Sequence, residues 1–154
     1  MTSRSDEISV FLEFEPDIPT ITHQNGVRPA VNSGKLRYYK TSDLRQLEAQ
    51  YISLLKPHAP AEPWDCPIHL TTVWYFRAPE KIKLRNAAWK TTKPDTDNLV
   101  KTLKDCMKKA GFFVDDALVC FDSIAKFFVP ADSMHGVHIR LAKLKEKETP
   151  LCQY

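Results

Sequence analysis

The densest group of chemically competent side chains is the segment 93–101, Lys-Pro-Asp-Thr-Asp-Asn-Leu-Val-Lys. Asp95 and Asp97 are one residue apart, and Asn98 follows directly. Carboxylates this close repel one another unless a cation compensates them, and carboxylate and amide oxygens suit a hard divalent cation. The alternative is structural, since aspartates at a helix start commonly cap the helix and complement its dipole.

A second acidic pair, Asp115 and Asp116, follows the helix that this segment begins. A helix over residues 98–110 rises by about 18 Å. An extended chain from its end to Asp116 travels back by about 20 Å. The spacing therefore predicts that Asp116 returns to the level of Asp95 and Asp97. Neighbouring strand residues point to opposite faces, so only one of the pair is expected to face the cluster.

Lys101 lies one helical turn after Asp97, close enough to orient a phosphate or a water molecule. Three carboxylates with one lysine are the groups that Mg²⁺-dependent phosphodiester hydrolysis uses. Mg²⁺ binds substrate phosphates, polarises the scissile group and lowers the pKa of its water.

The charge distribution fits a polyanionic partner. The chain has a net charge of +3, but residues 77–109 hold ten basic and four acidic residues, a local charge of +6 that leaves −3 elsewhere. Such a concentration of positive charge suits nucleic acid. Ordinary solvated lysines would give the same count, so charge alone does not decide.

The elements that must position these groups follow from hydrophobic periodicity. Strands are predicted over residues 8–15, 67–76, 118–129 and 137–144. Helices are predicted from Thr41 or Ser42 to the residue before Pro57, and from the acidic segment to Gly111. Residues 77–94 form a basic linker. The fold class is α+β, a mixed β-sheet with two main helices packed on it, in the order β-α-β-(linker)-α-β-β.

Residues 16–40 are predicted to form a long loop that carries Lys35 and Arg37 beside aromatic residues. Such a loop is either a nucleic-acid contact or a disordered connector. The 154 residues are expected to form a single domain, with flexible tails over 1–7 and 145–154. No apolar run long enough to span a membrane and no signal peptide is present, so a cytoplasmic protein with free cysteine thiols is expected.

The segment 93–101, the helix that ends near Gly111 and the segment 114–119, Val-Asp-Asp-Ala-Leu-Val, resemble the RusA family of Holliday junction resolvases. Members are typically encoded by phages or prophages. The match is specific over residues 93–126 and loose over residues 8–92. Residues 81–92 and 143–154 contain no family feature.

The resemblance implies a RusA-like fold and a homodimer that cuts four-way DNA junctions with paired nicks. It implies Mg²⁺, replaceable by Mn²⁺, and no organic cofactor. It assigns catalysis to Asp95, Asp97, Asp116 and Lys101, and metal binding to the same three aspartates with Asp115 as a further candidate. The expected location is the cytoplasm of a bacterial host cell, in association with the nucleoid, whether the protein is encoded by the host or by a phage. The basic residues expected to contact DNA are Lys35, Arg37, Arg85, Lys90, Lys93, Lys101, Lys104, Lys108 and Lys126.

Two other functions agree with the same residues. One is a less selective nuclease that acts on flaps or other branched DNA. The other is a non-catalytic DNA-binding module in which the acidic residues only cap a helix.

Overall fold

The computed structural model describes residues 6–145, except for the side chains of residues 23 and 24. Most of the predicted flexible tails, 1–7 and 145–154, therefore lies outside the described residues. Glu7 does not belong to a tail. It begins the first strand, and its carboxylate pairs with the Arg140 guanidinium at 2.6 Å.

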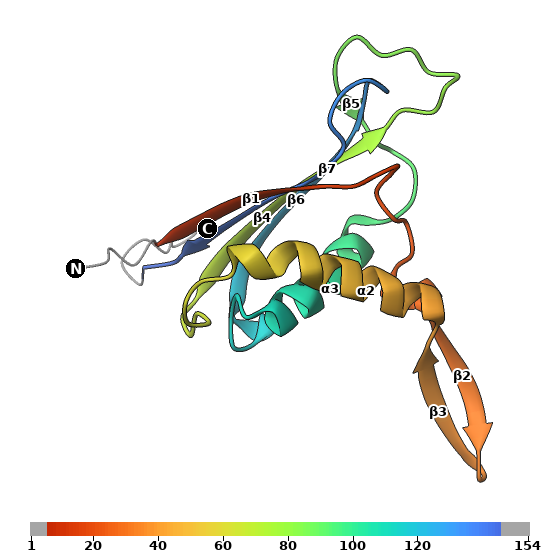
Figure 1. Ribbon diagram of the computed structural model, residues 1–154, viewed down its shortest axis with the longest axis vertical. Helices are drawn as coiled ribbons and strands as arrows, with labels where there is room; N and C mark the ends of the chain where they lie inside the picture. The colour runs from red at the N-terminus through yellow and green to blue at the C-terminus, as the bar shows by residue number, and fades with distance from the viewer. Residues whose placement is uncertain (1–5, 146–154) are drawn as a thin grey trace, which may run out of the picture.

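The centre of the fold is a five-stranded mixed sheet (Figure 1). Its strands are β1 (Glu7–Glu13), β4 (Ile68–Arg77), β5 (Ala88–Trp89), β6 (Val119–Val129) and β7 (Gly136–Lys143). Their spatial order is β1-β7-β4-β6-β5. Strands β4 and β6 are parallel, and every other neighbouring pair is antiparallel. The parallel pair requires a crossover connection, which α3 (Thr96–Ala110) supplies.

Two long helices, α2 (Ser42–Leu55) and α3, cover one face of this sheet (Figure 1). The predicted apolar stripe of α3 is buried, with Leu103 and Met107 fully inaccessible. Alternate residues of β4 face the same core, among them Leu70 and Trp74. The predicted fold class, α+β with a mixed sheet and two main helices, is confirmed.

Both long helices begin and end where local chemistry predicts. The Thr41 hydroxyl accepts a hydrogen bond from the Leu44 N–H at 3.3 Å and caps α2. Gly111 ends α3 in the left-handed conformation with φ of 92°, which glycine adopts without steric cost.

The prediction of a long loop over residues 16–40 is wrong. The chain forms a short helix, α1 (His23–Gly26), and a β-hairpin of β2 (Val27–Asn32) and β3 (Lys35–Lys40). Ser33 and Gly34 make the two-residue turn with φ of 52° and 74°, the left-handed values that tight hairpins favour. The hairpin projects away from the sheet and the helices (Figure 1). The sequence pattern conceals it because Pro29 argues against a strand and no hairpin side chain is buried.

Several smaller features also differ from the prediction or add to it. The first strand ends at Glu13 rather than at residue 15, and the linker 77–94 contains β5. Residues 56–58 form a 3-10 turn, η1 (Lys56–His58), and a second such turn, η2 (Asp116–Leu118), precedes β6. The observed order is therefore β1-α1-β2-β3-α2-η1-β4-β5-α3-η2-β6-β7.

Three of the four cysteines are described, and Cys66, Cys106 and Cys120 are free thiols as predicted. Among the described residues, no helix is long and apolar enough to cross a membrane.

Candidate functional site

The start of α3 presents two carboxylates. Asp95 occupies the N-cap position with extended backbone angles, φ −73° and ψ 151°, and its carbonyl oxygen accepts from the Leu99 N–H at 3.1 Å. Its side chain makes no capping hydrogen bond. Asp97 lies in the first turn, and both side chains are exposed. Within the described residues neither carboxylate has an ion-pair or hydrogen-bond partner, so capping does not explain Asp95.

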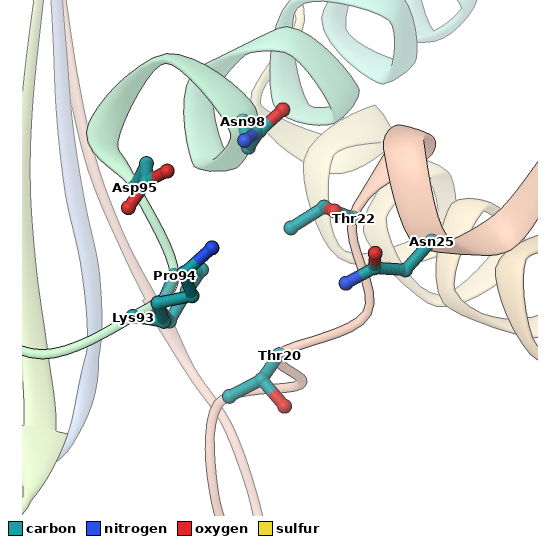
Figure 2. A pocket seen from close by; sticks show the side chains of 7 residues that line it. All are labelled: Thr20, Thr22, Asn25, Lys93, Pro94, Asp95 and Asn98. Carbon is teal, nitrogen blue, oxygen red and sulfur yellow. The ribbon is translucent and has the colours of Figure 1, made fainter.

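A pocket of about 280 Å³ adjoins Asp95 (Figure 2). Figure 2 shows Lys93, Pro94 and Asp95 on one side and Thr20, Thr22 and Asn25 across from them. Asn98 from the first turn of α3 completes the lining. The three residues of the far wall were not predicted as site residues, because residues 16–40 were expected to be a loop. The polar run 20–25, which α1 folds against the start of α3, was the available signal.

Two lysines hold the loop that carries Asp95. The Lys126 ammonium donates to the carbonyl oxygens of Thr92 and Pro94, both at 2.7 Å. The Lys90 ammonium donates to the Thr92 hydroxyl at 2.6 Å and lies 4.5 Å from the centre of the Phe128 ring. Burial, and then the Lys126 charge, lower the pKa of Lys90.

The prediction that Lys90 contacts DNA is therefore wrong, because only 8% of this residue is accessible. Lys126 was also predicted to contact DNA. Its ammonium is bonded to two backbone carbonyls, which makes it a residue that positions the acidic segment.

The second acidic pair lies at the other end of α3. Asp115 accepts from the Ala117 N–H at 2.9 Å, which caps η2, and from the Lys108 ammonium at 2.9 Å. These two hydrogen bonds, the backbone one first, together with the neighbouring Asp116 carboxyl group, lower the pKa of Asp115 to about 2. Asp116 is the first residue of η2, so the predicted extended return of the chain does not occur.

Strand β6 runs antiparallel to α3 from that end. Three lysine contacts mark the path: Lys108 with Asp115 at 2.9 Å, Lys104 with Asp122 at 2.9 Å, and Lys126 with the Pro94 carbonyl at 2.7 Å. The helix from Asp97 to Lys108 rises by about 16 Å. The prediction that Asp116 reaches the level of Asp95 and Asp97 within one chain is therefore wrong. Among the described residues, no three His, Cys, Asp or Glu side chains are grouped so that they could hold a metal ion.

The chemistry of the α3 start nevertheless fits a divalent cation. Asp95 and Asp97 supply hard oxygen ligands, and Asn98 lies beside them. Mg²⁺ in phosphoryl-transfer sites is commonly held by one or two carboxylates together with substrate phosphates. Two unpartnered carboxylates, of which Asp95 lines the pocket, provide the protein part of such a site.

The other predicted DNA contacts divide into two groups. Lys35 and Arg37 on the hairpin, Arg85 between β4 and β5, and Lys93 and Lys101 near the α3 start are exposed. Lys104 and Lys108 form the second group, because each ammonium already pairs with an aspartate of the η2 and β6 region.

The known proteins to which this chain is similar are named as endodeoxyribonucleases. The chain matches the family described as Endodeoxyribonuclease RusA over residues 18–142. It is also similar to a protein of Lactococcus phage r1t named crossover junction endodeoxyribonuclease rusA. The two are 34% identical over 112 residues, which cover 70% of this chain and 79% of the phage protein.

Proposed function

The chain belongs to the RusA family of endodeoxyribonucleases, and from that premise we propose that it resolves four-way DNA junctions by metal-dependent phosphodiester hydrolysis. The observation that carries the proposal is the Asp95 carboxylate, which occupies a helix N-cap position without capping and borders a pocket. A purely structural aspartate would use its oxygens on the helix. Membership in a nuclease family also argues against a non-catalytic binding module.

The roles of the residues follow from the geometry of α3. Asp95 and Asp97 would hold Mg²⁺, or Mn²⁺ in its place. The bound metal would supply polarisation of that phosphate and an activated water. Lys101 is exposed one turn beyond Asp97, where its ammonium can orient a phosphate oxygen. Lys126 and Lys90 keep the acidic loop in place, which fixes the geometry of the reacting groups.

Asp116 enters this site only if a second copy of the chain supplies it. In one chain Asp116 lies at the far end of α3, about 16 Å along the helix from Asp97. A two-fold axis across the middle of α3 and β6 would bring each copy's Asp116 towards the other copy's Asp95 and Asp97. Asp115 is the weaker candidate ligand, because Lys108 and the Ala117 N–H already occupy its oxygens.

The outer edge of β6 offers a place for that axis. Within the described residues, β5 pairs with β6 only at Phe127 and Phe128, so the edge over residues 119–125 has no partner strand. An unpaired edge of this length is a template for pairing with another chain. Antiparallel pairing of two such edges is isologous and gives two sites for two nicks. We therefore propose a homodimer joined along this edge.

The experiment is a cleavage assay on synthetic four-way junctions, linear duplexes and flaps, with and without Mg²⁺. We expect metal-dependent cutting that prefers the four-way junction. Equal cutting of all three substrates would indicate a less selective nuclease, the alternative function. Absence of metal-dependent cutting would contradict the proposal. A role in recombination at the nucleoid would follow from junction cleavage.

The shared site has a separate test by mixing subunits. Asp97→Asn and Asp116→Asn proteins should each be inactive, whereas co-refolded mixtures should regain nicking. In a mixed dimer, one site receives the intact Asp97 of one copy and the intact Asp116 of the other. If each site were built within one chain, mixing would restore nothing.

A further inference from the structure

The β2–β3 hairpin is exposed over nearly its whole length. Every residue from Arg28 to Tyr39 is exposed, and the hairpin projects beyond the helices (Figure 1). Residues 27–40 contain four basic residues and no acidic one. Lys40, at its base, pairs with Glu48 of α2 at 2.6 Å. A segment of this charge suits a polyanion, but most of the basic residues lie on only one of the two faces of the hairpin.

Strand register separates the hairpin residues into two faces, because opposite residues share a face and successive pairs alternate. One face is basic and consists of Arg28, Ala30, Asn32, Lys35, Arg37 and Tyr39. The other consists of Val27, Pro29, Val31, Leu36, Tyr38 and Lys40, and we call its outer members, Pro29, Val31, Leu36 and Tyr38, the apolar face. Val31, Leu36 and Tyr38 are 73%, 60% and 68% exposed.

The hairpin begins beside the candidate active site. Its base is closed by a hydrogen bond from the Thr41 N–H to the Gly26 carbonyl at 2.7 Å. Asn25, two residues before β2, lines the same pocket as Asp95. A DNA strand whose phosphate lies at Asp95 would therefore have its neighbouring nucleotides within the range of the hairpin.

We propose that the apolar face packs against the base pair exposed at a DNA branch point, while the basic face holds the phosphates of the adjoining arm. The proposal rests on the function proposed above and assigns the junction selectivity of that site to the hairpin. Base pairs at a branch point can lose a stacking neighbour, whereas those inside a linear duplex keep both. Aliphatic wedges, proline and aromatic side chains bind such base surfaces independently of sequence.

DNA fits this surface better than a second copy of the chain does. Stable protein interfaces bury about 800 Å² on each partner, more than four side chains on a two-stranded arm provide. Two hairpins placed together would also bring eight cations and no carboxylate of their own into one region. DNA offers phosphates to the basic face and base surfaces to the apolar face, so it can match both faces of the hairpin.

The test compares two double variants with a control. Leu36→Ser with Tyr38→Ser removes two of the four members of the apolar face, and Lys35→Ala with Arg37→Ala weakens the basic face. Met134→Ser is the control, since Met134 is 61% exposed in the β6–β7 connection, outside the hairpin. All of these side chains are exposed, and circular dichroism checks that each variant folds.

We expect the apolar-face variant to lower the ratio of junction to duplex affinity about tenfold, with duplex affinity unchanged. A 2-aminopurine placed at the branch point should change its fluorescence on binding the wild-type protein and not on binding this variant. The basic-face variant should weaken binding to both DNAs and reduce the slope of log affinity against log salt by about two.

An unchanged junction preference and fluorescence response in the apolar-face variant would overturn the inference. A change of oligomeric state in sedimentation, caused by this variant and not by Met134→Ser, would also overturn it, because the face would then be a subunit contact. Failure of the wild-type protein to cleave junctions would instead overturn the proposed function itself.

Discussion

The start of α3 and the β2–β3 hairpin are neighbours of the same pocket, but they are held in opposite ways. Seven residues of α3 are buried against the sheet and α2, and Lys126 fixes the loop before it. The hairpin buries none of its described residues from Val27 to Lys40. Regions with few buried apolar contacts open at low free energy, whereas core elements open only near global unfolding.

The difference matches two tasks. Phosphodiester hydrolysis needs carboxylates held within a fraction of an ångström, so they belong on an element anchored in the core. Binding branched DNA requires reach and adjustment to arms at variable angles, which an exposed arm provides. The hairpin is also linked to the opposite end of α3: the buried Glu48 carboxylate of α2 accepts from Lys40 of the hairpin at 2.6 Å and from Lys109, in the last turn of α3, at 3.2 Å.

The strongest test of this division is the removal of one carboxylate charge. Asp97→Asn should reduce junction cleavage about a thousandfold or more, because a neutral amide holds the cation poorly. Junction binding and the melting temperature should remain near the wild-type values. Asp105→Asn, on the same helix but away from the pocket, is the control. Equal loss of activity in both variants would remove Asp97 from the mechanism.

The two regions should also differ in how much they contribute to the free energy of unfolding. Leu103→Ala should lower the free energy of unfolding by about 2–5 kcal/mol, because Leu103 is fully buried. Leu36 lies on the exposed hairpin. Its replacement, Leu36→Ala, should change the free energy of unfolding by at most about 0.5 kcal/mol. Urea denaturation of both proteins gives the comparison. Similar losses would mean that the hairpin packs on the body in solution.

A lysine beside the acidic residues can act on the reacting phosphate or hold the DNA backbone, and Lys101 tests which of these roles applies. Lys101→Ala should reduce the single-turnover cleavage rate about tenfold to a hundredfold while junction affinity stays nearly constant. The reason is that Lys101 is expected to act on the reacting phosphate, whereas many other cations hold the backbone. Lys93→Ala is the matched control and should affect affinity more than rate. Cleavage at the wild-type rate would exclude Lys101 from the active site.

The smallest expected effect concerns Glu48, which links the hairpin to the C-terminal end of α3. Burial alone would raise the pKa of Glu48, but hydrogen bonds from Lys40 and Lys109 outweigh it and lower the pKa. A lowered folded-state pKa contributes stability above the unfolded pKa, and this contribution is lost as the pH falls through the folded value.

Glu48→Gln should therefore lower the free energy of unfolding by about 1 kcal/mol at neutral pH. The difference from the wild-type protein should shrink as the pH falls below the ordinary pKa of a glutamate, about 4.3. Thermal melts of both proteins across this range measure it, with Glu80→Gln on the exposed surface as the control. A difference that grows on acidification would contradict the assigned charge state.

The parts of the fold that could be predicted are those that nearby residues control. The extent of α3 follows from the apolar spacing of Leu103 and Met107 and from Gly111, which ends the helix. The hairpin could not be predicted in this way, because its alternation has no buried face and Pro29 stands in a strand. Its one local signal was the Ser33-Gly34 turn.

The sequence by itself determined the chemical groups and the helix that presents them, since capping, periodicity and the family motif involve residues that are close together along the chain. Only the tertiary structure decided where those groups meet. It buried Lys90 under the acidic loop, brought Thr22 and Asn25 opposite Asp95, and left Asp116 at the far end of α3. The physical reason is the direction of β6. That strand starts beside the C-terminal end of α3 and pairs parallel to β4, a long-range contact that no local pattern specifies.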